Sequence, residues 1–218
     1  MYNLTLCVFA LAMVLQGATP ARPSPAPGIA FSYRFENERF VVSRIEMTID
    51  GRGEGRLVFV RKGLSKPVER PVRITETVAG RLADLVTRLD FFASGEVYQT
   101  SGDHSNLGTV TLYASRDGLA REVVFNYTSN RDMTVLASTL RGIANREMFA
   151  FDLETATRFQ PLETPHLIEA LSNEIDLGRI TDPAALVPLL REMAGDVSLP
   201  LIARNRAGAL AVRVTSAP

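Results

Sequence analysis

The chain has 218 residues, which can hold one substantial domain or one domain with a smaller appendage. Its 24 Lys and Arg residues balance its 24 Asp and Glu residues, whereas a protein that binds nucleic acid by neutralising phosphates normally has a basic excess. We therefore expect no nucleic-acid partner.

The N-terminal segment predicts export. Leu4 to Leu15 is apolar except for Thr5, and the small residues of QGATPA follow it, as in a secretory signal peptide. The run of about 12 residues is shorter than the ~20 needed to cross a bilayer as a helix, so we expect no membrane span after cleavage near Ala18 or Ala21. No Lys or Arg precedes the run, which leaves a buried N-terminal strand or helix as the alternative.

Cysteine usage agrees with export. The only cysteine, Cys7, lies inside the predicted signal peptide (residues 1–21), so the mature chain has no disulfide, no thiolate nucleophile and no thiolate metal ligand. A Pro-rich linker is expected over residues 22–34. The sequence therefore predicts an exported protein, periplasmic or secreted.

The first regular pattern predicts two strands between Phe40 and Lys62. Four apolar residues share one side of a period-two alternation whose other side is polar, which is typical of a half-buried strand. These residues are Val41, Ile45, Met47 and Ile49. After a glycine-rich link, the β-branched and aromatic run RLVFV indicates the second strand.

The link DGRGEG, Asp50 to Gly55, meets the requirements of none of three functional loops: a dinucleotide-binding loop, a Walker phosphate loop and an EF-hand calcium loop. A dinucleotide-binding loop is followed by a helix, and no helical period follows Gly55. A Walker phosphate loop needs Gly-Lys-Ser/Thr, and an EF-hand calcium loop needs an oxygen ligand where Arg52 stands. The glycines therefore predict a hairpin turn in which Gly53 and Gly55 adopt positive φ.

Three more candidate strands and two helices follow. Val72–Ile74 is a candidate edge strand, and Thr75 is the expected N-cap of the helix after it. The segments LGTVTLYAS and REVVFNY indicate two strands joined by Asp117-Gly118, a dipeptide typical of hairpins. A second helix should be capped by Asn130 or Asp132. Apolar residues recur at helical spacing at Val78, Leu82, Leu85 and Leu89 in the first helix and at Met133, Leu136, Leu140 and Ile143 in the second.

The order of these elements predicts an α+β domain over residues 35–150, with a mostly antiparallel sheet of four to five strands and two helices on one face. The series DGRGEG, LDFF, Tyr98, Asp103 and TVTLYASRDGLAREVVF resembles an uncharacterised family of exported bacterial α/β domains. The likeness covers about residues 40–149, and its motifs are structural, so it implies a domain type and no activity. The sequence departs from the family by lacking the Cys-rich stretch that some members carry before the first hairpin.

The remaining residues predict a helical tail. Residues 151–164 lack a clear period and are the expected connector, and three helices should fill residues 165–214, the second of them kinked by Pro188. The pair LVPLLREMAGD and LIARNRAGALAVRV is similar to a single HEAT repeat over about 30 residues. One such unit cannot bury its own apolar face, so it must dock on the sheet domain or on a partner, and we expect the sheet domain to cover it. The apolar positions concerned are Leu167, Leu171, Leu189, Leu190, Ile202 and Leu210.

Charge is divided between the two parts. Residues 22–150 carry 18 basic and 15 acidic residues, and residues 151–218 carry 6 basic and 9 acidic residues. The resulting net charges of +3 and −3 favour docking of the tail on the domain, although incidental bias on solvated faces explains them equally well.

Residues that could carry chemistry are few. Ser, Asp and His stand together in the loop Ser101–Ser105, but adjacent residues point in different directions and no GxSxG elbow is present. The two histidines, His104 and His166, have Asp103 and Glu163 beside them, as a metal site would require, yet HExxH is absent. A polar loop explains the same residues. We therefore assign no catalytic, cofactor-binding or metal-binding residue and expect no cofactor.

Two classes of function stay open. The first is an exported, non-catalytic binding or protein-interaction module whose sheet edge or helical tail contacts an envelope protein. The second is a metal-dependent or hydrolytic enzyme with a site near Asp103, His104 and His166. A small-ligand binder with an apolar pocket between sheet and tail is a further alternative. Arg204 and Arg206 could bind an anion or make a surface or interdomain contact. The sequence does not indicate an oligomeric state.

Overall fold

A computed structural model describes residues 28–216 of the chain. The predicted signal peptide, residues 1–21, lies outside the described residues, as do residues 22–27 of the predicted linker. Within residues 28–216, no helix is both long enough and apolar enough to cross a membrane.

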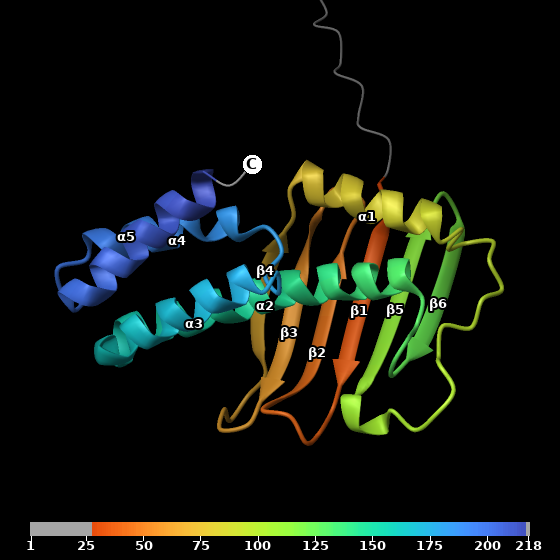
Figure 1. Ribbon diagram of the computed structural model, residues 1–218, viewed down its shortest axis with the longest axis horizontal. Helices are drawn as coiled ribbons and strands as arrows, with labels where there is room; N and C mark the ends of the chain where they lie inside the picture. The colour runs from red at the N-terminus through yellow and green to blue at the C-terminus, as the bar shows by residue number, and fades with distance from the viewer. Residues whose placement is uncertain (1–27, 217–218) are drawn as a thin grey trace, which may run out of the picture.

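The described chain builds a six-stranded antiparallel sheet with helices on one face, so the predicted α+β class is confirmed (Figure 1). The strand order is β4-β3-β2-β1-β5-β6, and every neighbouring pair is antiparallel. The strands are β1 (Ala30–Glu36), β2 (Val42–Ile49), β3 (Glu54–Arg61), β4 (Val68–Arg73), β5 (Thr109–Arg116) and β6 (Leu119–Phe125).

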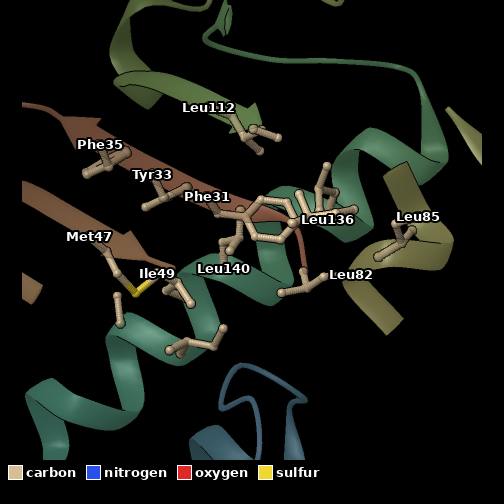
Figure 2. Packing of buried hydrophobic residues seen from close by; sticks show 14 of the residues in the cluster. Phe31, Tyr33, Phe35, Met47, Ile49, Leu82, Leu85, Leu112, Leu136 and Leu140 are labelled. Atoms are coloured by element: carbon tan, nitrogen blue, oxygen red, sulfur yellow. The ribbon is translucent and has the colours of Figure 1, made fainter. Parts of the chain in front are cut away.

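Helices α1 (Glu76–Arg88) and α2 (Arg131–Phe159) cover the same face of the sheet (Figure 1). Thr75 caps α1 and Asn130 caps α2, because each side-chain oxygen accepts a backbone N–H three residues later. Their apolar stripes pack on the inward side chains of the strands, and all eight stripe residues expected from the sequence are buried. Figure 2 shows part of this core, with Phe31, Tyr33, Phe35, Met47, Ile49, Leu82, Leu85, Leu112, Leu136 and Leu140 labelled.

The DGRGEG segment is the predicted hairpin turn between β2 and β3, and its glycines are needed for two different reasons. Gly53 has a φ of +80°, which a β-branched residue rarely adopts. Gly55 does not have a positive φ, so that part of the prediction is wrong. A Cβ atom at Gly55 would instead lie 1.8 Å from the carbonyl oxygen of Thr48 on the neighbouring strand.

The sheet has one strand more than expected, and the missed strand is central. Residues 30–34, which the sequence assigned to the Pro-rich linker, belong to β1, which lies between β2 and β5. Its inward residues Phe31, Tyr33 and Phe35 are buried. Val41 was expected on the buried side of β2 but is 65% exposed, because the register shifts between Val42 and Arg44.

Helix α2 extends through most of the expected connector. The segment 151–164 is helical as far as Phe159, and the next helix begins at Thr164. The first half of α2 faces the sheet core, whereas Ala150, Leu153 and Ala156 belong to a second core farther along the helix. Because two cores cover different stretches of one helix, its apolar residues show no single stripe over the whole length.

The tail is built on this second core and extends beyond the β4 edge of the sheet (Figure 1). Three helices follow α2, namely α3 (Thr164–Asp176), α4 (Val187–Gly195) and α5 (Leu201–Ser216). Pro188 does not kink a helix; it lies in the first turn of α4, after a 3-10 turn over residues 183–186. Residues of α3, α4 and α5 bury one another, so the expectation that the sheet covers the tail is wrong. Of the expected apolar positions Leu171, Leu190 and Leu210 are buried, Leu167 and Leu189 half-buried, and Ile202 52% exposed.

Ion pairs and hydrogen bonds fix the directions of the tail helices. Arg206 of α5 donates to the carbonyl oxygen of Pro165 in the first turn of α3, and Arg213 reaches Asp176 at its last residue. Helices α3 and α5 therefore run parallel. The tail thus consists of two helix pairs side by side, the second half of α2 with α3 and α4 with α5.

Candidate functional site

The loop that holds Asp103 and His104 is stabilised by its own contacts. The Asp103 carboxylate accepts the backbone N–H of Ser105 at 3.0 Å, which lowers the pKa of Asp103 below its ordinary value. The ring of His104 lies 4.8 Å from the ring of Tyr127, which follows β6. Both contacts belong to the end of the sheet near the start of β5.

His166 lies in a different part of the molecule. It is exposed on α3, whose neighbours are α2 and α5, on the opposite side of the picture from the loop before β5 (Figure 1). The structure therefore does not bring His166 together with Asp103 and His104. Across residues 28–216, no group of three or more His, Cys, Asp or Glu side chains could hold a metal ion.

The arginines of the last helix make contacts within the tail. Arg206 donates at 2.8 Å both to the carbonyl oxygen of Pro165 and to the carboxylate of Glu169. This is a contact between α5 and α3, one of the two alternatives that the sequence left open for this residue. Arg204 is half-buried on the same helix.

A groove between the β4 edge, the second half of α2, and α4 combines both parts of the molecule in one concave surface. We call it the β4–α4 groove. Its volume is about 680 Å³, which lies within the range of ligand-binding clefts. It is lined by Val68, Glu69 and Arg70 of β4, by Phe151, Glu154, Thr155, Thr157, Arg158 and Phe159 of α2, and by Pro188, Leu189, Glu192, Met193 and Asp196 of α4 and its end.

The floor of the β4–α4 groove is held by a half-buried ion pair between sheet and helix. Arg70 of β4 donates two hydrogen bonds to the Glu154 carboxylate of α2, at 2.6 and 2.8 Å. These bonds raise the pKa of Arg70 above its ordinary value. Arg61 of β3 makes a second ion pair with Asp152 of α2. Two-pronged guanidinium–carboxylate contacts are directional, so they set the angle at which α2 leaves the sheet.

The α4 wall of the β4–α4 groove carries two carboxylates, and the charge of Arg204 on α5 acts on one of them, Asp196. Glu192 and Asp196 stand one turn apart, and neither forms an ion pair with any residue in the described range 28–216. The hydroxyl and backbone N–H of Ser198 donate to Asp196 at 2.6 and 2.9 Å, which lowers the pKa of Asp196 and keeps it ionised. One carboxylate oxygen of Asp196 accepts both bonds, which leaves the other free to accept from a ligand.

The α2 wall combines an apolar and a basic side chain. The Phe159 side chain is 74% exposed at the end of α2, although half-buried Leu189 lines the same groove. Arg158 beside it is exposed and has no carboxylate partner within the part of the chain that the structure describes. The β4–α4 groove therefore offers an aromatic contact between a basic side chain and two carboxylates, none of which forms an ion pair among residues 28–216.

The sequence did not predict the β4–α4 groove, because its walls come from three segments far apart in the chain. Arg70 and Glu154 are 84 residues apart, and their pairing depends on α2 passing the β4 edge. The one local signal is the spacing of Glu192 and Asp196, which places both carboxylates on one side of a helix. The spacing alone does not show which elements lie opposite these two carboxylates.

Comparison with known proteins adds no relative. The chain matches no protein-family model, and no curated protein is significantly similar to it. The resemblance to exported bacterial domains stays a prediction from the sequence, and the function is argued from the β4–α4 groove.

Proposed function

We propose that the protein is an exported, non-catalytic interaction module that binds a segment of an envelope protein in the β4–α4 groove. The observation that carries the proposal is that Glu192 and Asp196, which form no ion pair among residues 28–216, line a concave surface that also exposes Phe159. Recognition sites of proteins typically combine an aromatic contact with a few placed polar groups.

The composition of the groove favours a peptide segment as the ligand. Exposed Phe159 and half-buried Leu189 provide apolar contact area, and a cation of the partner would be held between the two carboxylates of α4. A carboxylate of the partner would in turn pair with Arg158. A partner segment that carries an apolar residue next to charged residues satisfies all these groups together.

The scaffold supports this role because the walls of the groove are held by packed elements. Met193 of α4 is buried in the tail core, and Leu153 of α2 is buried in the same core. The Arg70–Glu154 pair fixes the third wall to α2. A groove with preformed walls loses little conformational entropy when a ligand binds.

Site-specific photo-crosslinking tests the proposal. A photoreactive phenylalanine analogue is placed at position 159, where it keeps an aromatic side chain in the groove, or at position 191, which is exposed on α4 but does not line the groove. In the native host we expect one dominant adduct from position 159, weaker or absent from position 191, and lost when Asp196→Lys is added. Equal adducts from both positions, or none from position 159, would contradict the proposal.

A further inference from the structure

The two edges of the sheet differ in how their peptide groups are occupied. Directly after β4 the N–H of Ile74 donates to the carbonyl oxygen of Gly53, directly before β3. By alternation, Glu69, Pro71 and Arg73 direct their peptide groups away from the sheet. Pro71 has no N–H to donate. The carbonyl oxygen of Arg73 accepts from Arg146 at 2.7 Å. The β4 edge is therefore closed to a further strand at two of these three positions.

Among residues 28–216, the β6 edge has neither a proline nor an outward carbonyl oxygen that accepts a hydrogen bond from a side chain. The two-residue turn Asp117-Gly118 pairs Arg116 with Leu119, so every second residue from Leu119 bonds to β5. The residues between them, Ala120, Glu122 and Val124, direct their peptide groups outward. Within the described chain these peptide groups make no hydrogen bond outside the β5–β6 pair, and none of the three residues is proline.

The loop after α1 contacts β6 on its helix-covered side and at its end. Arg121 points to the helix-covered face, where it donates to the carbonyl oxygens of Phe91 at 2.8 Å and Glu96 at 2.6 Å. Directly after β6, the Gln99 side chain accepts the N–H of Asn126 at 2.6 Å, and the N–H of Thr100 donates to the carbonyl oxygen of Tyr127 at 3.0 Å. The outward peptide groups that the loop does not bond therefore end at Val124.

We propose that β6 binds an extended segment of a partner protein as an additional antiparallel strand, with a Lys or Arg of that segment opposite Glu122. Glu122 is exposed and forms no ion pair within residues 28–216. Val124, which is 53% exposed, lies beside it on the same face of the sheet. Cross-strand pairs of opposite charge and of apolar side chains stabilise strand pairing, so these two positions specify a basic and an apolar residue in the partner.

A second copy of this chain does not fit the same edge. The antiparallel register that uses all three outward residues places Glu122 of one copy opposite Glu122 of the other. It also places Ala120 opposite Val124. Like charges directly opposite each other destabilise a strand pair, so the edge disfavours self-association and accepts a complementary segment.

The probe for this proposal is a displayed library of random nonapeptides, selected on the mature protein. We expect selected peptides that carry a Lys or Arg two positions away from an apolar, β-branched residue, so that both lie on the face of Glu122 and Val124. Amide hydrogen exchange at Ala120, Glu122 and Val124 should slow at least about tenfold on binding, whereas the amides of Arg121 and Val123 are protected already. In a bound peptide, every second N–H should face β6 and the others should face away. Methylation of the nitrogens that face β6 should abolish binding, and methylation of the others should not.

Two variants at one position separate the edge from the rest of the surface. Val124→Pro removes an outward N–H that the β5–β6 pair does not use, as Pro71 does in β4, and should abolish binding. Val124→Thr keeps that N–H and the branched side chain and should bind within about threefold of the wild type. Circular dichroism and melting temperature show whether each variant is folded.

Each other outcome counts against β6. Failure to select any peptide, unchanged exchange at the three amides, or equal binding by Val124→Pro overturns the proposal. A concentration-dependent dimer that protects the same amides also overturns it, since the occupant is then a second copy. Peptides that bind Val124→Pro but not Glu192→Lys occupy the β4–α4 groove, which supports the proposed function while excluding the β6 edge.

Discussion

Arg146 and Asp182 join the sheet to the helical tail. The Arg146 guanidinium, only 1% exposed, lies 3.4 Å from the Asp182 carboxylate, which precedes α4. The same side chain donates to Glu147 at 2.8 Å and to the carbonyl oxygen of Arg73 at 2.7 Å. One buried cation of α2 therefore contacts the end of β4 and the loop between α3 and α4. Asp182 has a φ of +55°, which is uncommon for a residue other than glycine.

Removal of the Arg146 side chain should destabilise the fold strongly. Arg146→Met leaves the half-buried carboxylates of Glu147 and Asp182 without a cation, and breaking one partner of a buried ion pair costs about 3–5 kcal/mol. Arg213→Met is the matched control, because Arg213 pairs with Asp176 on the surface, where an ion pair is worth about 0.2–1 kcal/mol. Urea unfolding measures both. A loss below about 1 kcal/mol for Arg146→Met would show that the cluster does not stabilise the fold.

Substitution of the hairpin glycines should harm folding. In Gly53→Val a β-branched residue is forced to positive φ, and in Gly55→Val the new Cβ meets the Thr48 carbonyl oxygen. Both variants should melt several degrees below the wild type. Gly80→Ala is the opposite control: nothing lies within 4 Å of the added Cβ, and alanine in a helix is favoured over glycine by about 1 kcal/mol. A normal melting temperature for Gly55→Val would contradict the close approach.

Local chemistry made much of this fold predictable. The positive φ at Asp117 and Gly118 follows from the Asp-Gly dipeptide, and the caps Thr75 and Asn130 follow from side chains that accept backbone N–H groups. Each of these features depends on residues within about four positions of one another. Such features need no knowledge of the rest of the chain.

The errors lie where distant parts of the chain decide the structure. β1 follows a Pro-rich run, and what stabilises it is pairing with β2 and β5, the second of which begins at Thr109. The length of α2 depends on the tail core, which buries Leu153 against residues far along the chain. For the same reason the sequence does not show that the charged residues of the β4–α4 groove are neighbours, or that the fold separates His104 from His166.

Acid should remove the contribution of the Asp50 side chain to stability. The backbone N–H groups of Glu54 and Arg52 donate to this carboxylate and lower its pKa. A folded-state pKa below the unfolded value of about 3.9 stabilises the fold at higher pH, and the effect is lost as the pH falls through the folded-state pKa. Asp50→Asn should therefore be less stable than the wild type at pH 7, with a smaller difference near pH 3.

The control for this pH effect is Glu38→Gln, because Glu38 is exposed and its carboxylate makes no hydrogen bond among the described residues. Its urea midpoint should follow that of the wild type at both pH values. A stability difference between Asp50→Asn and the wild type that grows as the pH falls would contradict the claim that the ionised Asp50 carboxylate stabilises the fold.

Export predicts a shortened mature chain. Mass spectrometry of the protein from its native host should find the N-terminus near residue 19 or residue 22, after Ala18 or Ala21. The control is a variant in which Leu11→Arg interrupts the apolar run, which should stay uncleaved. An intact wild-type N-terminus in the cytosol would contradict both export and the envelope partner.

The tail should be required for full stability of the sheet, although the two have separate cores. A fragment of residues 28–150 ends inside α2 and lacks Asp152, Glu154 and Asp182, the carboxylates that pair with Arg61, Arg70 and Arg146. In this fragment buried Arg146 loses one of its two acidic partners, and α2 is cut off before its natural end. The melting temperature of the fragment should therefore lie well below that of residues 28–216.

Charge variants of the full chain distinguish this explanation from a simple effect of length. If ion pairs are the reason why the tail stabilises the sheet, Asp182→Asn in residues 28–216 should reproduce part of the decrease in melting temperature. In this variant Arg146 again lacks its Asp182 partner. Glu163→Gln is the matched control, since Glu163 is exposed in the tail and forms no ion pair among the described residues. A fragment as stable as the full chain, together with a silent Asp182→Asn, would mean that the two units fold independently and that the tail contributes only the α4 wall of the groove.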